Sequence, residues 1–299
     1  MKHASPLIAI ITLNWNGLDH LKYFLPTATK QDYPNYVTII VDNASSDNSV
    51  EYVKHNYRDA ILLESKKNLG YSRGFNLGIK KAISINAEYL LITNNDVELD
   101  ESILTSSLEL FSQMKDIGYM SGKIFDLKKR DMFQRAGGRK QLTGLNRGAF
   151  EFDKGQYEKI EFFDYIDDVC GIVPTEVIKT VGPYDNDFFY DFEEAEWHLR
   201  MKRNGYKLIY NPKMVAWHAE HGRTKGTHSS PIPQFHHWRS KILFYYKTKS
   251  PNYFLCFIIP FLFCEIPLHW FTLLKKSNPR LIYYNFKGLI SGLKYIINN

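Results

Sequence analysis

The sequence has few cysteines. Its 299 residues contain three, Cys170, Cys256 and Cys264, and no two of them have the close spacing of a metal-binding pair. An odd number of well-separated cysteines argues against a disulfide framework and favours a reducing compartment.

A strong excess of one charge is also missing. Lysine and arginine total 38 against 32 acidic residues, so the formal net charge is only +6. The first 230 residues contain no basic block with interleaved aromatic residues, which a nucleic-acid-binding protein of this size would normally have. We therefore expect no nucleic-acid partner. The basic excess lies mainly in residues 231–299, which indicates a local partner surface there.

Signatures of two nucleotide-binding folds and of a leader are absent as well. The sequence contains neither GxGxxG nor GxxxxGK followed by Ser or Thr, which argues against dinucleotide or P-loop chemistry. The first apolar run, residues 7–13, leads directly into Asn14-Trp15-Asn16-Gly17, without a small-residue cleavage site. We therefore predict a strand and a turn there rather than a signal peptide, and a cytoplasmic catalytic region.

Strand-like and helix-like segments alternate in the first third of the chain. Four short apolar runs have the length of buried strands, and they are residues 7–13, 37–41, 60–63 and 89–93. Segments with helical spacing separate them, at 18–30, 50–57 and 74–85. This alternation predicts an α/β fold, with a mostly parallel sheet flanked by helices.

Polar residues follow the predicted strands or their loops. They form four groups, which are Asn14 with Asn16, Asp42 with Asn43, Asn68 with Gly70, and Asn94 with Asn95 and Asp96. Ligands of such sheets bind outside the carboxyl ends of the strands. The pattern therefore predicts that the four groups converge on one ligand-binding edge.

Three of these groups have specific chemical interpretations. Asp42 can accept the imide N–H of a pyrimidine base, or it can close an Asx-turn. Arg73 and the helix start beside it can face a diphosphate, or the loop can be a tight turn. Asp96 can bind Mg²⁺ or Mn²⁺ together with substrate phosphates, because Asn94 and Asn95 are neutral; it can also cap the strand end.

Acidic residues and a histidine mark the second half of the chain. Glu193, Glu194 and Glu196 open a predicted helix that ends near Arg203, where one or two of them stabilise the helix dipole. The remaining one can serve as a general base. His218 follows a strand-like stretch, as a ligand or as a structural histidine.

In order and spacing, these motifs resemble the family 2 glycosyltransferases, especially the bacterial rhamnosyltransferase-like branch with the GT-A fold. The matching residues run over about 6–225 and comprise 14–17, 31–34, 41–47, 68–70, 74–76, 94–96, 170–171, 181–185, 188–189, 193–196 and His218.

The resemblance implies a role for each matching residue. Asp42 would contact the nucleobase, Asp96 would bind a divalent metal (Mg²⁺ or Mn²⁺), and His218 would complete the metal site. Glu194 would be the base of an inverting reaction, with Glu193 as the fallback, because glutamate stands where the family usually has aspartate. The other donor-side residues would be Asn14, Asn16, Asn43, Asn68, Gly70, Arg73, Asn94 and Asn95. The acceptor-side candidates are Asp168, Cys170 and Gly171, of which Asp168 is a distant third choice for the base.

The C-terminal region differs in character from the rest. Residues 253–274 are apolar except for Glu265, His269 and Thr272, and Pro260 and Pro267 interrupt them. They can span a bilayer, lie on an anionic membrane surface, or pack on the catalytic domain. Basic flanks and the prolines favour surface contact, through residues 250–295. We expect a GT-A catalytic domain at 1–230, with a nucleotide-sugar half at about 1–120 and an acceptor half at about 120–230, and a helical, apolar appendage at 231–299.

Together these features predict an inverting, metal-dependent glycosyltransferase of cell-surface polysaccharide synthesis, at the inner face of the cell membrane. Its donor would be dTDP-rhamnose or a UDP-hexose, and its acceptor a hydroxyl of a glycan or lipid-linked glycan. The alternatives are a sugar-nucleotide-binding protein without catalysis and a nucleotidyltransferase. The latter would need a basic triphosphate loop after the first strand, which residues 14–17 do not supply.

Overall fold

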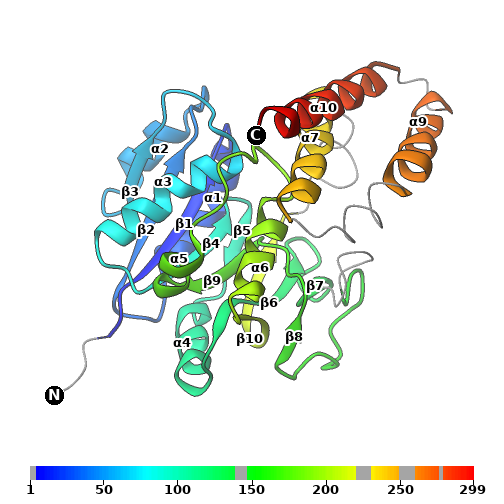
Figure 1. The fold of residues 1–299 in the computed structure, drawn as a ribbon. Helices are drawn as coiled ribbons and strands as arrows, with labels where there is room; N and C mark the ends of the chain where they lie inside the picture. The colour runs from blue at the N-terminus through cyan, green and yellow to red at the C-terminus, as the bar shows by residue number, and fades with distance from the viewer. Residues whose placement is uncertain (1–4, 139–146, 220–229, 249–259, 276–278) are drawn as a thin grey trace. The chain divides into compact units, whose positions relative to one another are not determined.

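The computed structural model describes residues 5–138, 147–219, 230–248, 260–275 and 279–299. The chain forms two compact units (Figure 1). The first comprises Met1–Tyr184 and Trp197–Glu220, and the second comprises Asp185–Glu196 and His221–Asn299. Each unit is described below by itself.

The first unit begins with the predicted parallel sheet. Its four strands are β1 (Ile8–Asn14), β2 (Tyr36–Asp42), β3 (Ile61–Glu64) and β4 (Tyr89–Asn94), in the spatial order β3-β2-β1-β4. All three pairings among them are parallel. The connecting helices are α1 (Leu18–Ala28), α2 (Ser49–Asn56) and α3 (Gly70–Ser84). These elements confirm the alternation predicted from the sequence.

Beyond β4 the sheet is mixed rather than mostly parallel. The later strands are β5 (Val97–Leu99), β6 (Ile117–Asp126), β7 (Phe133–Ala136), β8 (Glu161–Phe163), β9 (Cys170–Pro174) and β10 (Lys207–His218). Among these later strands, as the described residues show them, β6 and β10 are parallel neighbours, whereas β9 runs antiparallel to both β4 and β6. The segment from β6 to β9 contains no crossover helix among its described residues, so its chain reversals produce antiparallel pairs.

Helices cover both faces of this sheet. Ile8 and Ile10 of β1 pack with Phe24 of α1 in one apolar cluster, whereas Ala9 and Ile11 pack with Phe75 of α3 in another. Alternate residues of a strand point to opposite faces, so β1 is buried on both sides, as its continuous apolar run predicts. Two further helices, α4 (Ile103–Gln113) and α5 (Thr175–Val181), had no predicted counterpart; α4 packs in the first cluster and α5 in the second.

The long strand β10 carries His218 to the carboxyl end of the sheet. The strand-like stretch predicted before His218 is one long strand that begins at Lys207, with a register shift between Tyr210 and Val215. At its end β10 pairs antiparallel with β5, so that His218 lies opposite Val97. This register places His218 beside the residue that precedes Val97, Asp96.

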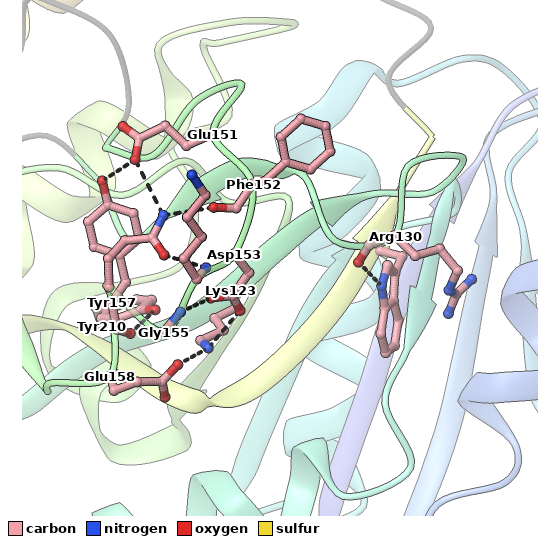
Figure 2. A network of polar contacts seen from close by, with 12 residues as sticks. Lys123, Arg130, Glu151, Phe152, Asp153, Gly155, Tyr157, Glu158 and Tyr210 are labelled. Carbon is pink, nitrogen blue, oxygen red and sulfur yellow. Dashed lines mark hydrogen bonds and ion pairs between the residues drawn. The ribbon is translucent and has the colours of Figure 1, made fainter.

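A polar network secures the segment after β7 (Figure 2). Lys123 of β6 forms ion pairs with Asp153, at 3.1 Å, and with Glu158. Tyr210 of β10 donates a 2.8 Å hydrogen bond to the carbonyl oxygen of Tyr157. Burial would lower the pKa of Lys123, but the bonds to Glu158 and Asp153 outweigh it and raise that pKa. The segment is therefore anchored to two strands of the sheet.

The second unit consists mainly of helices in its described residues. It contains α7 (Pro231–Lys247), the π-helix η2 (Phe261–Glu265), α9 (Ile266–Lys275) and α10 (Pro279–Asn298). Lys247 forms ion pairs of 2.6 Å with both Asp185 and Asp187, which explains why residues 185–196 group with the C-terminal helices. The apolar stretch 253–274 lies partly outside the described residues. Within the part that the structure describes, we find no helix with the length and apolarity that crossing a membrane requires.

Candidate donor and metal site

The ends of β1, β2 and β4 are joined by side-chain hydrogen bonds. Asn14 donates to Oδ1 of Asp42 at 3.1 Å and accepts from Nδ2 of Asn95 at 2.8 Å. Ser45 links this group to Asn16, because its hydroxyl oxygen accepts bonds from the Asn14 side chain and the Asn16 backbone N–H. The predicted convergence of these polar groups on one edge of the sheet is confirmed.

Gly17 permits the close approach of these side chains. A Cβ atom at this position would lie 2.4 Å from Nδ2 of Asn95 and 2.6 Å from Oδ1 of Asn14. Any larger residue would therefore separate the two amides that join β1 to the loop after β4. Close packing, as well as hydrogen bonding, therefore explains the residues of the turn Asn14-Trp15-Asn16-Gly17.

A second group of amides fixes the start of α3. Asn43 donates to Oδ1 of Asn68 at 3.0 Å and to the carbonyl oxygen of Gly70 at 3.1 Å, and it accepts from the N–H of Leu69. This network holds the helix N-terminus beside the end of β2. Arg73 stands in the first turn of α3 with an exposed side chain. A helix N-terminus with an arginine is suited to an anionic group such as a diphosphate.

Asp96 and His218 form the next feature of this edge. Nε2 of His218 lies 3.2 Å from Oδ1 of Asp96, and the two side chains are 11% and 19% exposed. Burial would raise the pKa of the Asp96 carboxyl, but the charge and hydrogen bond of His218 outweigh burial and hold it below its ordinary value. The site therefore keeps Asp96 as a carboxylate.

Gln134 sets the orientation of the imidazole. Its Nε2 donates to the carbonyl oxygen of His218 at 2.7 Å, so its Oε1 is the atom that lies 2.7 Å from Nδ1 of the ring. An acceptor at that position means that Nδ1 carries a hydrogen, and the second ring nitrogen is the one presented to Asp96. Gln134 was not predicted, because nothing in the sequence links a glutamine of β7 to a histidine of β10.

The geometry of this pair suits a cation. In a neutral imidazole with a hydrogen on Nδ1, Nε2 is an acceptor, and it faces a carboxylate oxygen that is also an acceptor. The two are compatible only if a proton or a metal ion lies between them. Nitrogen and oxygen ligands, with the outer ring nitrogen hydrogen-bonded, are the usual arrangement for a bound metal. Within the described residues, no third His, Cys, Asp or Glu completes a cluster around them.

The strand end that carries His218 is braced by its neighbour. Trp217 donates a 3.1 Å hydrogen bond from its indole to the carbonyl oxygen of Arg130, and the Arg130 guanidinium stacks over the ring at 4.1 Å. Arg130 also pairs with Glu98 of β5 at 2.7 Å. These contacts tie β10, β5 and the β6–β7 turn together around the histidine.

Asp168 is a buried carboxyl that is linked to the same edge of the sheet through Tyr71. Its Oδ1 accepts the Tyr71 hydroxyl at 2.8 Å, and its Oδ2 accepts the Tyr184 hydroxyl. Burial raises the pKa of Asp168 to about 6, against the opposing effect of the two tyrosine hydrogen bonds. Tyr71 belongs to the first turn of α3, and its hydroxyl also lies 3.5 Å from Oδ1 of Asn94. Asp168 therefore braces the helix start.

Asp168→Asn should flatten the pH dependence of stability. Between the ordinary pKa of 3.8 and about 6, the folded state holds a proton that the unfolded state has released. Raising the pH through this window therefore lowers the free energy of unfolding. Across this window the free energy of unfolding should fall by roughly 1–3 kcal/mol less in the variant than in the wild type. Denaturant unfolding at several pH values measures this difference. The exposed Asp59→Asn is the control, and parallel curves for Asp168→Asn and wild type would contradict the prediction.

The other acceptor-side candidates lie in the interior. Cys170 is 1% exposed within an apolar cluster, and burial raises the pKa of its thiol to about 12. Gly171 follows it in β9 and packs directly against the ring of Tyr119. Both residues belong to β9, the strand that follows Asp168.

The predicted helix of acidic residues is α6 (Glu193–Arg203). Glu193, Glu194 and Glu196 belong to the second unit, and the unit boundary runs through the helix after Glu196. Glu193 and Glu196 are buried, and Glu194 is half-buried. The predicted helix bounds are confirmed, whereas the roles of these carboxylates stay predictions.

Comparisons with known proteins identify a family, related sequences and a similar fold. The model of the family described as "Glycosyl transferase family 2" matches residues 8–172. One similar protein is the dolichyl N-acetyl-alpha-D-glucosaminyl phosphate 3-beta-D-2,3-diacetamido-2,3-dideoxy-beta-D-glucuronosyltransferase of Methanococcus voltae. It is 26% identical over 225 residues, which are 70% of this chain and 65% of that protein, so the chain spans less than two thirds of this relative.

A second relative and a solved structure extend the comparison. The N-acetylglucosaminyl-diphospho-decaprenol L-rhamnosyltransferase of Mycobacterium tuberculosis is 20% identical, over 74% of this chain and 80% of that protein. The mannosyltransferase of Pyrobaculum calidifontis, solved in complex with GDP-Man and Mn²⁺, has a TM-score of 0.57 at 15% identity. That match covers 98% of this chain and 76% of that chain. It shows that the GT-A fold is shared.

Proposed function

The chain belongs to glycosyl transferase family 2, and on this premise we propose that it transfers a sugar from a nucleoside-diphosphate sugar to a hydroxyl of a glycan or lipid-linked glycan. The observation that supports this proposal best is the pairing of Asp96 with His218, 3.2 Å apart at the carboxyl edge of the sheet. The network around Asn14 and Asp42 stands at the same edge.

Divalent metal binding is part of the proposal. Asp96 and His218 would hold the ion, and the donor's phosphates would supply further oxygen ligands. When bound, such an ion supplies positive charge to a diphosphate leaving group. Arg73 and the N-terminus of α3 would add to that stabilisation. Asp42 would accept the imide N–H of the base, which thymine and uracil both carry.

The proton transfer is assigned to Glu194. The acceptor hydroxyl would lose its proton to Glu194 while its oxygen forms a bond to the anomeric carbon and the bond from that carbon to the diphosphate breaks. Attack opposite the leaving group inverts the configuration at that carbon. Glu193 is the fallback for this role, because each of the two acids is a glutamate within the first turn of α6.

The donor can be identified by thermal shift. We expect dTDP-rhamnose or a UDP-hexose to raise the melting temperature in the presence of Mn²⁺. A ligand at a hundred times its Kd stabilises the folded state by about 2.7 kcal/mol, which corresponds to a shift of several degrees. Equal shifts with and without Mn²⁺ for every sugar nucleotide would contradict the metal-dependent proposal.

Gln134→Leu should weaken metal binding without removing a ligand. The change frees Nδ1 of His218 from its 2.7 Å partner, so the ring loses its fixed orientation. Loss of such an outer partner typically lowers metal affinity by about 10- to 100-fold. Titration of Mn²⁺ against the donor-dependent thermal shift measures this change. Gln156→Leu, which alters an exposed glutamine of the same unit, is the control, and equal Mn²⁺ midpoints would refute the role of Gln134.

Two alternatives remain testable by product analysis. A sugar-nucleotide-binding protein would bind the donor but release no nucleoside diphosphate, with or without acceptor. A nucleotidyltransferase would release pyrophosphate from a sugar phosphate and a nucleoside triphosphate. The proposal also includes contact with the cytoplasmic face of the cell membrane, where a lipid-linked acceptor would be found.

A further inference from the structure

One face of helix α10 is buried within the second unit. Leu281, Asn285 and Leu289 are buried on this face. A Cβ at Gly288 would lie 2.3 Å from the carbonyl oxygen of Phe235, and one at Gly292 would lie 2.7 Å from Cβ of Ile242. Both of these neighbours belong to α7, so the two glycines let the helices pack with their backbones close together (Figure 1).

An adjacent face of α10 is apolar and exposed. We call it the α10 stripe, and it consists of Tyr283, Phe286, Ile290, Leu293 and Ile297. Their exposed fractions are 54%, 50%, 37%, 49% and 82%, respectively. Alternating spacings of three and four residues keep all five on one side of a helix. A continuous row of exposed apolar side chains of this kind marks an interaction surface.

A row of cations borders the stripe. Arg280, Lys287 and Lys294 repeat every seven residues, so they also share one side of the helix, and all three are exposed. Nζ of Lys287 lies 4.5 Å from the ring centroid of Tyr283, which places the row directly against the stripe. Helix α10 contains no acidic residue. The combined surface is therefore apolar along one line and positively charged along the next.

We infer that α10 lies flat on an anionic lipid surface, with the α10 stripe in the acyl boundary and the cationic row among the lipid phosphates. This inference deepens the membrane contact of the proposed function by naming the face that makes it. An amphipathic helix with lysine or arginine beside large apolar side chains binds membranes in this orientation. A second copy of the chain is the less suitable occupant, because a symmetric contact along the stripe would bring two cationic rows together.

The row and the stripe can be tested separately with the full chain. Sedimentation would be measured with vesicles of phosphatidylcholine alone and with vesicles that also contain phosphatidylglycerol. We expect the wild type to bind only the anionic vesicles strongly. Each basic residue at such a surface contributes roughly fivefold in affinity, so Lys287→Glu with Lys294→Glu should weaken binding by at least about 25-fold. Ile290→Asn with Leu293→Asn should weaken it by at least about tenfold at unchanged charge.

Matched double variants in the first unit serve as controls. Lys80→Glu with Lys115→Glu makes the same change of charge at exposed positions, and Ile160→Asn with Phe162→Asn removes at least as much exposed apolar surface. Both should bind vesicles as the wild type does. Three results would overturn the inference. They are vesicle binding by the α10 variants equal to that of the wild type, no vesicle binding by the wild type, and a dimer that only the α10 stripe variants dissociate.

The donor thermal shift separates this inference from the proposed function. It needs no vesicles, and all four double variants should retain it together with the wild-type melting temperature. Vesicle binding without any donor shift would refute the proposed function and leave the role of α10 standing. A normal donor shift without vesicle binding would refute the role of α10 and leave the proposed function standing.

Discussion

Glu194→Gln is expected to lower kcat by about 10²–10⁴-fold while donor affinity stays within a few-fold of the wild type. Glutamine has the size and polarity of glutamate but cannot take a proton from the acceptor hydroxyl. In the proposed function the donor binds to the first unit, at Asn14, Asp42 and Asp96, whereas Glu194 belongs to the second unit. The loss should therefore appear in turnover and not in the donor-dependent thermal shift.

Glu193→Gln is the matched variant for this experiment. It makes the same chemical change one residue earlier in α6, so it tests the fallback assignment directly. Release of nucleoside diphosphate in the presence of acceptor measures turnover for both. Near-normal turnover of Glu194→Gln would remove Glu194 from the reaction. If the large loss occurs only in Glu193→Gln, the base is Glu193.

Asp96→Asn should abolish the Mn²⁺-dependent part of donor binding and lower kcat/KM by about 10²–10⁴-fold. The substitution keeps the shape of the side chain but removes its charge. The carboxylate is held ionised beside His218 despite its burial, so its charge is a built feature of the site. An amide in its place is a much weaker ligand for a hard cation and leaves the donor's diphosphate less well neutralised.

Asp100→Asn is the control for this change. Asp100 follows β5, and its carboxylate accepts bonds from Ser102, so the variant removes one nearby negative charge without altering the pair at Asp96. Thermal shift with donor, with and without Mn²⁺, and steady-state transfer assays measure both variants. An unchanged Mn²⁺ response in Asp96→Asn would refute the assignment of this carboxylate to the metal.

The sequence alone determined the elements of the first third of the chain and the location of its polar edge. Apolar runs such as residues 7–13 and the helical spacings between them are local patterns, and a local pattern determines a local element. The geometry of parallel sheets then requires that residues at strand ends, such as Asn14 and Asp42, lie at one edge. The same reasoning placed Asp96 there, and it predicted the bounds of α6.

The tertiary structure decided the partners of those residues. Asp96 meets His218 because β5 and β10 pair with a particular register, and Gln134 reaches the same imidazole from β7. Strand register across such sequence separations depends on the packing of the whole sheet. The sheet is also mixed beyond β4 for this reason, since the antiparallel position of β9 is a long-range pairing.

The same distinction applies to the C-terminal helices. Composition predicted an apolar helical region with basic neighbours, but it did not tell which apolar residues are covered. Only the packing of Gly288 and Gly292 against α7 decides that Leu289 is buried and that Ile290 and Leu293 are exposed. A helix has several apolar positions around its circumference, and the neighbour that covers one face determines which of the others meets the surroundings.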